Sequence, residues 1–317
     1  MSEIRSKEIA IIIPVFNEES VLLTFHEQLI QVVDPLPNKT RIYYVDDGSV
    51  DQTPNLLADL QMQDERVRVL TLSRNFGHQA ALTCGLDHAL GDLIITMDGD
   101  GQNPPELIPE MINLYTAGYD IVIAQRLEDD FLPWFKRFTS NLFYKVINAI
   151  GNLDIPPHAA DFRLLTRPVV EALKSMPEFH RFLRGMISWA GFNSVVLPYQ
   201  PRKRLGGKSK YTLKKMTKLA EDAIFSFSLV PLKIGLVIGG LFYLLALLEA
   251  IYVLSFWITG NQIKLEPGWS SLMFMLLIVG GTLTTVVSLI GIYIGHIFQD
   301  VKRRPIYLLK QKSDQDQ

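Results

Sequence analysis

The chain has 317 residues, enough for one sizeable α/β core and a smaller second part. Its 31 Lys and Arg nearly balance its 33 Asp and Glu, so the net charge indicates no class of partner. The single Cys84 excludes an intrachain disulfide and agrees with a reducing compartment.

The N-terminal part alternates between two kinds of hydrophobic pattern. Short apolar and β-branched runs predict strands at residues 9–15, 42–45, 67–72, 93–97 and 121–124. Helical patterns separate them at residues 18–33, 54–63, 77–90 and 104–117. This alternation predicts an α/β fold with a mostly parallel sheet and helices on both faces. Ligands bind such sheets outside the carboxyl ends of the strands.

Polar segments follow the predicted strands. They read "PVFNEES", "VDDGSVDQT", "SRNFGH", "MDGDGQNPP" and "QR". Taken singly, each is more typical of a turn or a helix cap, because Asp, Asn, Gly and Ser favour both. Their convergence on one edge of a parallel sheet favours a binding site there.

The segment "TMDGDGQNPPE" (96–106) places Asp98 and Asp100 one residue apart after an apolar run. Two carboxylates so close repel each other unless a cation lies between them, and the glycine between them lets the backbone approach a ligand. Hard oxygen donors without nearby Cys or paired His favour Mg²⁺ or Mn²⁺, which typically bind substrate phosphates. The sequence therefore predicts a metal site that receives a diphosphate.

Two long apolar segments lie near the C-terminus. Residues 232–258 carry only Lys233 and Glu249 as charged side chains, and residues 267–299 contain no Asp, Glu, Lys or Arg. Each exceeds the roughly 20 residues that cross a bilayer, so we predict two transmembrane helices rather than buried core helices. No apolar segment of a signal peptide occurs at the N-terminus.

Basic residues next to these segments predict the orientation. They lie before or at the start of the first segment and after the second, at Lys214, Lys215, Lys218, Lys233, Lys302, Arg303 and Arg304. The loop between the segments holds only Lys264. By the positive-inside rule, both termini and the large N-terminal part face the cytoplasm.

Two further segments, 131–151 and 211–227, show apolar residues at helical spacing with basic residues between them. Each fits an amphipathic helix in the membrane interface, although packing on the soluble core remains an alternative. The basic segment "RKRLGGKSKY" (202–211) fits a phosphate-binding loop that uses Arg204 and Lys210. It equally fits a basic segment next to the membrane, and the segment can serve both purposes, because anionic lipid headgroups attract the same charges.

A family resemblance rests on five segments taken together. They are "IIIPVFNEES", "YYVDDGSVDQT", "LSRNFGHQAALTCGLDHALGDLIITMDGDGQNPPELIPEM", "DFRLL" and "RLGGKSKY". This set resembles the polyprenyl-phosphate glycosyltransferases of inverting glycosyltransferase family 2, which include dolichol-phosphate mannose synthase and the bactoprenol glucosyltransferases. The chain looks most like the bactoprenol glucosyltransferase branch over nearly its whole length.

The resemblance implies a GT-A-type fold and a metal-dependent hexosyltransferase with a nucleotide-sugar donor. UDP-glucose is the leading donor and undecaprenyl phosphate the expected acceptor; GDP-mannose and UDP-modified sugars remain open. The implied nucleotide-binding residues are Pro14, Asn17, Glu18, Asp46 and Asp98. The implied metal ligands are Asp100 and Gln102, with Asp98 nearby.

Further implied residues concern phosphate and acceptor. The family's R-x-x-G-x-S-K-Y pattern matches here and implies phosphate contacts by Arg204, Ser209 and Lys210. Asp161 stands where the family places its candidate base, and Arg163 follows it. A phosphate monoester is already largely a dianion at pH 7, so Asp161 is expected to position the acceptor more than to deprotonate it.

Other features limit the alternatives. The Q-x-x-R-W motif of processive family members is absent, since Arg184 and Trp189 lack its spacing, so a single sugar transfer is implied. A sugar nucleotidyltransferase would carry a glycine-rich N-terminal loop, which is missing. A membrane-anchored nucleotide-sugar binder without turnover stays possible as a second class, and the full set of acidic and basic site residues counts against it.

We expect five parts along the chain. Residues 1–130 form the nucleotide-sugar-binding part, 131–211 the acceptor side, 212–230 a juxtamembrane helix, 231–299 the transmembrane hairpin and 300–317 a cytoplasmic tail. Small residues four apart at Gly235 and Gly239, and at Gly291 and Gly295, predict close helix packing. We expect a homo-oligomer, with Glu249 as an ionisable group inside a span; packing of the two helices only against each other is the alternative.

Overall fold

The computed structural model describes residues 6–127, 148, 156–157, 159–176, 178–179, 181–202 and 268–310, with short stretches between 237 and 258. The chain forms two compact units. One comprises Met1–Ala223 together with Arg303–Gln317, and the other comprises Ile224–Lys302.

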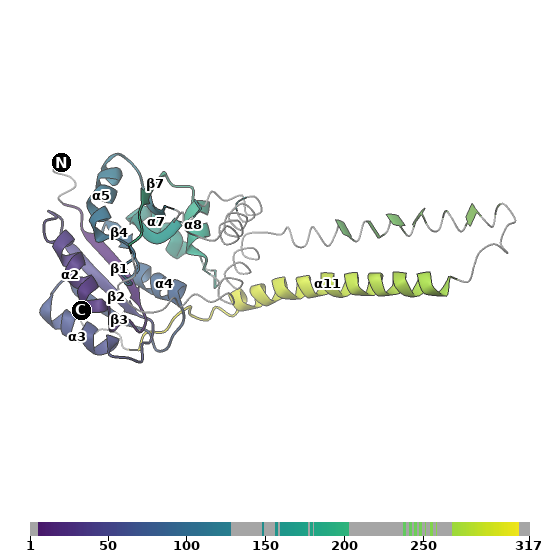
Figure 1. The fold of residues 1–317 in the computed structure, drawn as a ribbon, viewed down its shortest axis with the longest axis horizontal. Coiled ribbons are helices and arrows are strands. Elements are labelled where there is room, and N and C mark those ends of the chain that lie inside the picture. Colours follow the sequence, from purple (N-terminus) through teal and green to yellow (C-terminus); the bar gives the residue numbers. More distant parts are fainter. Residues whose placement is uncertain are drawn as a thin grey trace. The chain divides into compact units, whose positions relative to one another are not determined.

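The first unit contains one seven-stranded sheet (Figure 1). Its strands are β1 (Ile9–Val15), β2 (Thr40–Asp46), β3 (Val67–Thr71), β4 (Leu93–Thr96), β5 (Ile121–Arg126), β6 (Ala159–Thr166) and β7 (Ser194–Tyr199). Their order is β3-β2-β1-β4-β6-β5-β7, and only β6 runs antiparallel to its neighbours. The mostly parallel sheet is confirmed, whereas β6 and β7 were not among the predicted strands.

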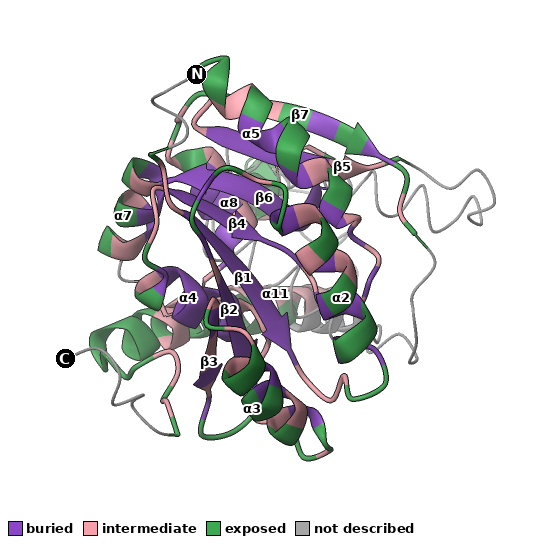
Figure 2. Cartoon of the chain, turned by 90° about the vertical axis from the view of Figure 1, so that its left-hand side faces the viewer, coloured by how far each residue is buried: buried purple, intermediate pink, exposed green. Residues whose placement is uncertain are grey.

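Helices cover both faces of this sheet. They are α2 (Leu22–Val33), α3 (Thr53–Gln63), α4 (His78–His88), the short 3₁₀ helix η1 (Pro105–Leu107) leading into α5 (Ile108–Thr116), α7 (Arg167–Ser175) and α8 (Leu183–Trp189). Figure 2 shows most strands buried, with the edge strand β7 partly exposed; α2, α3 and α5 are exposed on their outer sides, whereas α4 is largely buried. The first helix begins at Leu22, four residues later than the predicted start at Glu18.

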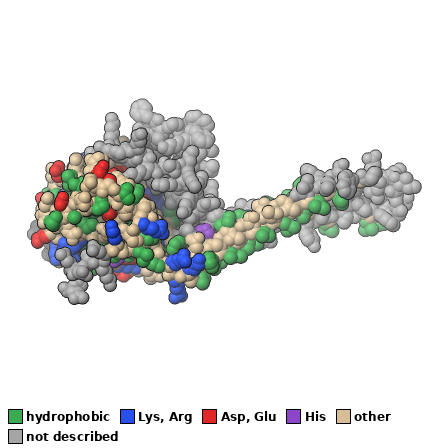
Figure 3. Space-filling view, turned by 90° about the horizontal axis from the view of Figure 1, so that it is seen from below, with side chains coloured by type: hydrophobic (Ala, Val, Ile, Leu, Met, Phe, Trp, Pro, Cys, Tyr) green, Lys and Arg blue, Asp and Glu red, His purple; other side chains and the backbone are tan. Residues whose placement is uncertain are grey.

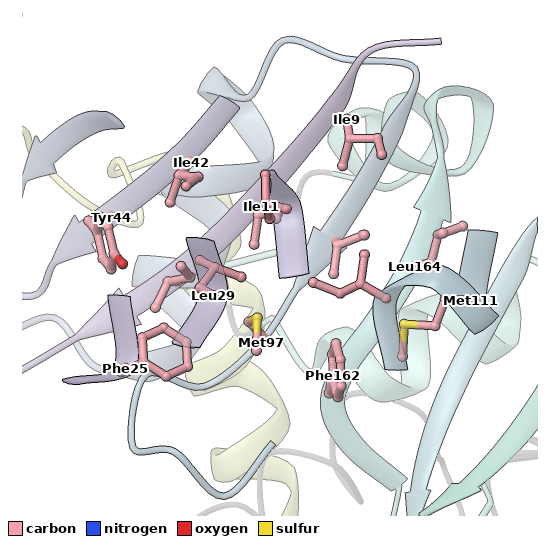
Figure 4. Packing of buried hydrophobic residues seen from close by; sticks show 14 of the residues in the cluster. Ile9, Ile11, Phe25, Leu29, Ile42, Tyr44, Met97, Met111, Phe162 and Leu164 are labelled. Atoms are coloured by element: carbon pink, nitrogen blue, oxygen red, sulfur yellow. The ribbon is translucent and has the colours of Figure 1, made fainter. Parts of the chain in front are cut away.

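The two faces of β1 pack differently. Ile9, Ile11 and Ile13 join one buried cluster with Phe25 of α2 and Met111 of α5 (Figure 4). Full burial of one such side chain contributes about 1.5–3 kcal/mol to stability. On the other face, α4 lies so close to β1 that a Cβ at Gly85 would overlap Ile12. These contacts hold the strand ends, and the loops that follow them, in fixed positions.

The C-terminal segment of the first unit extends the edge of the sheet. Leu309 forms an antiparallel bridge with Leu72. The Ser73 N–H donates to the Leu308 carbonyl at 2.8 Å, and the Lys310 N–H donates to the Thr71 carbonyl at 2.7 Å. Residues 308–310 thus pair with the C-terminal end of β3 and with the two residues after it, whose backbone groups would otherwise be unpaired at the sheet edge.

The second unit contains α11 (Trp269–Val301), a helix of 33 residues. Within the described residues, one helix is long and apolar enough to cross a membrane, at Ile278–Val301 with a mean hydropathy of 1.8. Figure 3 shows hydrophobic side chains exposed along α11. The predicted first span lies mostly outside the described residues, and so do the two amphipathic segments and the basic loop with Arg204, Ser209 and Lys210.

Candidate active site

The loops after β1 and β2 bind each other at the carboxyl edge of the sheet. The Asn17 N–H donates to the Ser49 hydroxyl, and the Val50 N–H donates to Asn17 Oδ1, both at 2.9 Å. The Glu18 N–H donates to the Thr53 hydroxyl at 2.9 Å. These bonds explain the late start of α2. They also make residues 17 and 18 part of a fixed wall, above the buried Pro14 of β1.

Asp46 ends β2 with its side chain buried. Its Oδ1 accepts a hydrogen bond from the Ser49 N–H at 2.9 Å, whereas its Oδ2 is buried without a hydrogen-bond partner. A buried acceptor left unpaired costs about 1–3 kcal/mol. The arrangement therefore suits a ligand that donates a hydrogen bond, as a ribose hydroxyl or a base N–H does.

Asp47, in the loop after β2, forms hydrogen bonds that link this loop to the loop after β3. Its carboxylate accepts hydrogen bonds from the N–H groups of Phe76 at 2.7 Å and Gly77 at 2.9 Å. Burial raises the pKa of Asp47, although these two hydrogen bonds oppose the rise. Gly48 has φ of 70°, and a Cβ there would lie 2.5 Å from the Arg74 backbone. Only glycine allows the two loops to approach this closely.

Asp98 lies among several polar groups after β4. Its Oδ1 is 3.5 Å from His78 Nε2, and its Oδ2 is 3.5 Å from Arg126 Nη2. The Asn103 side-chain amide donates to Oδ2 at 3.3 Å. Burial raises the pKa of Asp98; His78 opposes this, and the Asp161 and Asp100 carboxylates raise the pKa further.

The glycine between the two aspartates packs inward. A Cβ at Gly99 would lie 3.1 Å from Ile13 and 3.2 Å from Val15, so the glycine permits close packing on β1. The sequence had suggested that this glycine admits a ligand. Asp100 turns back on the loop, where its Oδ1 accepts a hydrogen bond from the Gln102 N–H at 3.0 Å.

The donor set of this loop fits a divalent cation in part. No group of three or more His, Cys, Asp and Glu suited to a metal occurs among the described residues. The Asp98 and Asp100 carboxylates and the Gln102 amide are nevertheless hard oxygen donors on one loop. Burial, and then the neighbouring Asp161 and Asp100 carboxylates, raise the pKa of Asp98, and a cation bound between Asp98 and Asp100 would offset the repulsion between them. Water and substrate phosphates commonly complete such a coordination sphere.

The antiparallel direction of β6 brings Asp161 to the same edge. Thr96 of β4 donates its hydroxyl hydrogen bond to the Asp161 carbonyl at 2.8 Å. The Asp161 carboxylate contacts Arg163 on the same strand, Arg184 of α8 and His78 of α4. Burial raises the pKa of Asp161, but Arg184, His78 and Arg163 outweigh it and hold this pKa well below its usual range. Asp161 is therefore a stable carboxylate and a weak proton acceptor.

Sequence reasoning missed a second polar network beside Asp98. Tyr199, at the end of β7, donates its hydroxyl to Asn103 Oδ1 at 2.8 Å, and Arg126 Nε donates to the Tyr199 hydroxyl at 3.1 Å. Asn103 is fully buried. The strand-end position of Arg126 and the "QNPP" segment were visible signals, but their meeting with β7 is not local in sequence.

The start of the basic segment lies against the Asp98–Gln102 loop. The Arg202 N–H donates to the Gln102 carbonyl at 3.2 Å, and the Arg202 guanidinium pairs with Glu106 at 2.9 Å. The structure thus brings together residues at positions 14, 17, 18, 46, 98, 100, 102, 161 and 163 on one sheet edge. His78 and Arg184 join them and were not predicted as site residues.

The mostly parallel sheet, with helices on both faces, is a GT-A-like α/β fold. Residues 10–174 match the family described as Glycosyl transferase family 2. The chain belongs to glycosyltransferase family 2.

Its relatives match over nearly the full chain. An uncharacterized glycosyltransferase, sll0501 of Synechocystis, is 39% identical over 303 residues, covering 95% of this chain and 94% of that protein. The uncharacterized glycosyltransferase YkcC of Bacillus subtilis is 37% identical over 97% of this chain and 94% of its own length. The SfII prophage-derived bactoprenol glucosyl transferase of Shigella flexneri is 37% identical over 96% of this chain and 98% of its own length.

Proposed function

We propose that the protein transfers one hexose from a nucleotide-sugar to a polyprenyl phosphate, with inversion at the anomeric carbon. The name of the Shigella relative supports a glucosyl group and a bactoprenol acceptor, because that protein matches over almost its entire length. UDP-glucose is accordingly the proposed donor and undecaprenyl phosphate the proposed acceptor. GDP-mannose or a UDP-modified sugar is the alternative donor for the same reaction.

One observation carries this proposal: two different buried carboxylates lie at one sheet edge in an order that suits donor and acceptor. Asp46, with its unpartnered oxygen, ends β2. Asp98 follows β4, and Asp161 lies on β6, so β1 and β4 separate Asp46 from Asp161. We assign the nucleoside to the Asp46 side, the diphosphate to the Asp98–Asp100 loop and the acceptor to the Asp161 side.

The proposed reaction is a single in-line displacement. An acceptor phosphate oxygen bonds to the anomeric carbon while the bond from that carbon to the diphosphate oxygen breaks. The acceptor needs no general base, because its second pKa near 6 leaves it largely dianionic at pH 7. Asp161, whose low pKa makes it a poor base, is assigned a positioning role.

A divalent cation fits the same scheme. Asp100 and Gln102, with Asp98, would hold Mg²⁺ or Mn²⁺, which would supply positive charge to the departing diphosphate. Arg204, Ser209 and Lys210 lie outside the described residues, and we propose them as phosphate contacts on the strength of their family pattern. Arg202, which precedes them, pairs with Glu106 beside the Asp98–Gln102 loop and supports this assignment.

The acceptor is a membrane lipid, so we propose that the protein is anchored by two transmembrane helices. The second would be α11, and the first would span residues 231–258. Both termini and the first unit would face the cytoplasm, in keeping with the basic residues beside these segments.

A donor panel tests this proposal. Purified protein in detergent would be incubated with Mg²⁺, undecaprenyl phosphate and each of several nucleotide-sugars, and the lipid fraction would be assayed for sugar. We expect lipid-linked sugar from one donor and none with Asp100→Asn. A nucleotide-sugar that binds tightly without any transfer would instead favour a non-catalytic membrane-anchored binder.

A further inference from the structure

We propose that Arg184 binds the phosphate group of the acceptor lipid, and that Asp161 holds the Arg184 guanidinium in position until that phosphate arrives. The inference rests on the proposed function and assigns a residue to the acceptor side of the same site. Arg184 lies on α8, and Asp161 lies on β6.

Both carboxylate oxygens of Asp161 are already engaged. Oδ1 accepts hydrogen bonds from Arg163 Nη2 and from Arg184 Nε, each at 3.1 Å. Oδ2 accepts a hydrogen bond from Arg184 Nη2 at 2.9 Å, and His78 Nε2 lies 3.4 Å away. Arg184 thus forms a bidentate contact with both carboxylate oxygens of Asp161. A guanidinium binds phosphate in the same geometry.

The two arginines around Asp161 differ in exposure. The Arg163 side chain is 4% exposed and lies within the sheet on β6, whereas the Arg184 side chain is 19% exposed. Arg184 therefore borders the solvent, and Arg163 does not. The Asp161 carboxylate pairs with two guanidinium groups. If a phosphate binds Arg184 and separates it from Asp161, Asp161 therefore still pairs with Arg163. The exchange leaves no buried carboxylate uncompensated, which would otherwise be strongly unfavourable.

The order of the strands places Arg184 on the acceptor side. From β2, which ends at Asp46, the sheet passes through β1 and β4 to β6. Arg126 of β5 lies close to the Asp98 carboxylate, and its Nε donates to the Tyr199 hydroxyl. Although β5 lies beyond β6, Arg126 is thus held next to Asp98 of the loop assigned to the diphosphate. Among the described arginines, Arg184 is the one that binds Asp161 from outside the sheet, where His78 of α4 also contacts Asp161.

Contacts between α4 and α8 fix the position of Arg184. The Leu183 N–H at the start of α8 donates to Gln79 Oε1 at 3.3 Å, and Gln79 is adjacent to His78 on α4. The two helices therefore bring His78 and Arg184 to Asp161 together. This arrangement explains how a helix of only seven residues presents a side chain to the site in a defined direction.

The test measures binding of a soluble prenyl phosphate, geranyl phosphate, to the full-length protein with UDP and Mg²⁺ present. We expect Arg184→Gln to weaken geranyl phosphate binding about 10- to 100-fold. Arg184→Lys should weaken it less, because lysine keeps the positive charge but cannot form the bidentate contact. The affinity for UDP should change less than about twofold. Arg181→Gln is the matched control, since Arg181 donates to the Met176 carbonyl and should leave both affinities unchanged.

Two results would overturn the inference. One is an unchanged affinity for geranyl phosphate in Arg184→Gln, including the case in which neither protein binds it. The other is an equal loss of UDP affinity and geranyl phosphate affinity in both Arg184 variants, which would indicate a structural role.

The Michaelis constant for undecaprenyl phosphate separates this inference from the proposed function. Geranyl phosphate binding that depends on Arg184, without any sugar transfer by the wild type, would remove the proposed reaction and leave the phosphate contact. Sugar transfer by the wild type with an unchanged Michaelis constant in Arg184→Gln would remove only the assignment of Arg184.

Discussion

Two buried aspartates show how differently the same side chain can be used at this site. Asp46 keeps one carboxylate oxygen without a partner, whereas both oxygens of Asp161 accept hydrogen bonds from arginines. The first aspartate has an oxygen that can accept a hydrogen bond from a ligand. The second is arranged to hold a guanidinium. The local sequence alone does not distinguish the two roles, because each aspartate lies in a mostly apolar strand segment.

The unpartnered oxygen of Asp46 leads to a prediction about the nucleotide. Asp46→Asn should weaken UDP binding about tenfold or more, because an amide retains only one acceptor oxygen and places donors beside the ligand's own donors. Titration calorimetry with UDP measures the effect. Asp34→Asn is the control, since Asp34 is exposed and pairs with Arg66. Equal UDP affinity in wild type and Asp46→Asn would contradict the assignment.

His26 leads to a prediction about stability and pH. Its Nδ1 lies 3.0 Å from the Tyr44 hydroxyl, and burial lowers its pKa, with partial opposition from Asp64. The folded protein therefore keeps His26 neutral where the unfolded chain, with a histidine pKa of about 6.5, takes up a proton. Stability from this group is present above about pH 6.5 and falls as the pH drops below it.

His26→Gln tests this pH dependence, because glutamine can bond Tyr44 but does not titrate. The free energy of unfolding should fall less steeply for the variant than for the wild type between about pH 6.5 and 5.5. Denaturant unfolding at each pH measures both slopes. Parallel slopes would show that His26 does not contribute to the acid sensitivity.

At the scale of elements, sequence patterns predicted the parallel half of the sheet well. Strands β1 to β5 and helices α2 to α5 alternate between strong strand and helix patterns, and each lies within a few residues of its predicted bounds. β6 and β7 were missed for local reasons. β6 reads "AADFRLLT" and buries Asp161 and Arg163, while β7 reads "SVVLPY" and contains Pro198. Buried charges and a strand proline both obscure the usual signal.

The candidate site was predictable only where a motif lies next to a strand end. The resemblance to family 2 predicted from their motifs the residues at positions 46, 98, 100 and 161, which the structure places at one sheet edge. It did not identify Arg184, because that residue reaches Asp161 from 23 positions away through the packing of α8 on α4. Tyr199 is separated from Asn103 by 96 positions. Such contacts depend on tertiary packing, which no local pattern encodes.

The C-terminal segment that pairs with the end of β3 leads to a prediction at this scale. Deletion of residues 305–317 should lower the free energy of unfolding of the first unit by about 1–3 kcal/mol, because it removes the two backbone hydrogen bonds to Thr71 and Ser73. It should also weaken UDP binding, since β3 leads into the loop whose N–H groups hold Asp47.

Deletion of residues 311–317 is the matched control, because it keeps both hydrogen bonds and the contact of Tyr307 with Asp87. Thermal unfolding and UDP titration compare the two truncated proteins. The same stability in both would show that the pairing of residues 308–310 with the end of β3 does not contribute.

At the scale of the whole molecule, the protein combines a GT-A-like α/β unit with a long apolar helix. The helix α11 is 33 residues long and rises about 50 Å at 1.5 Å per residue, which exceeds the hydrocarbon thickness of a bilayer. Basic residues follow it at Lys302, Arg303 and Arg304. This combination suits an enzyme that takes a water-soluble donor and a lipid acceptor.

The small residues of α11 lead to a prediction about assembly. A Cβ added at Gly291 or Gly295 would meet nothing within 4 Å, so this stripe is open within the described residues. If it mediates homo-oligomers, Gly291→Ile should reduce crosslinked dimer in membranes, because the larger side chain prevents close helix approach. Val286→Ile is the control, because Val286 lies on roughly the opposite side of the helix from Gly291 and Gly295. Crosslinking that gives only monomer in the wild type would contradict homo-oligomer formation.

The mass spectrum of the lipid product tests the central proposal most directly. Wild-type protein would be incubated with Mg²⁺, undecaprenyl phosphate and each nucleotide-sugar of the donor panel in turn, beginning with UDP-glucose, and the extracted lipid would be compared with that from Asp100→Asn. The proposed function predicts a product heavier than the acceptor by one hexose residue, with no further additions and none in the variant. An unmodified acceptor, with the nucleotide-sugar either intact or hydrolysed to free sugar for every donor in the panel, would contradict it.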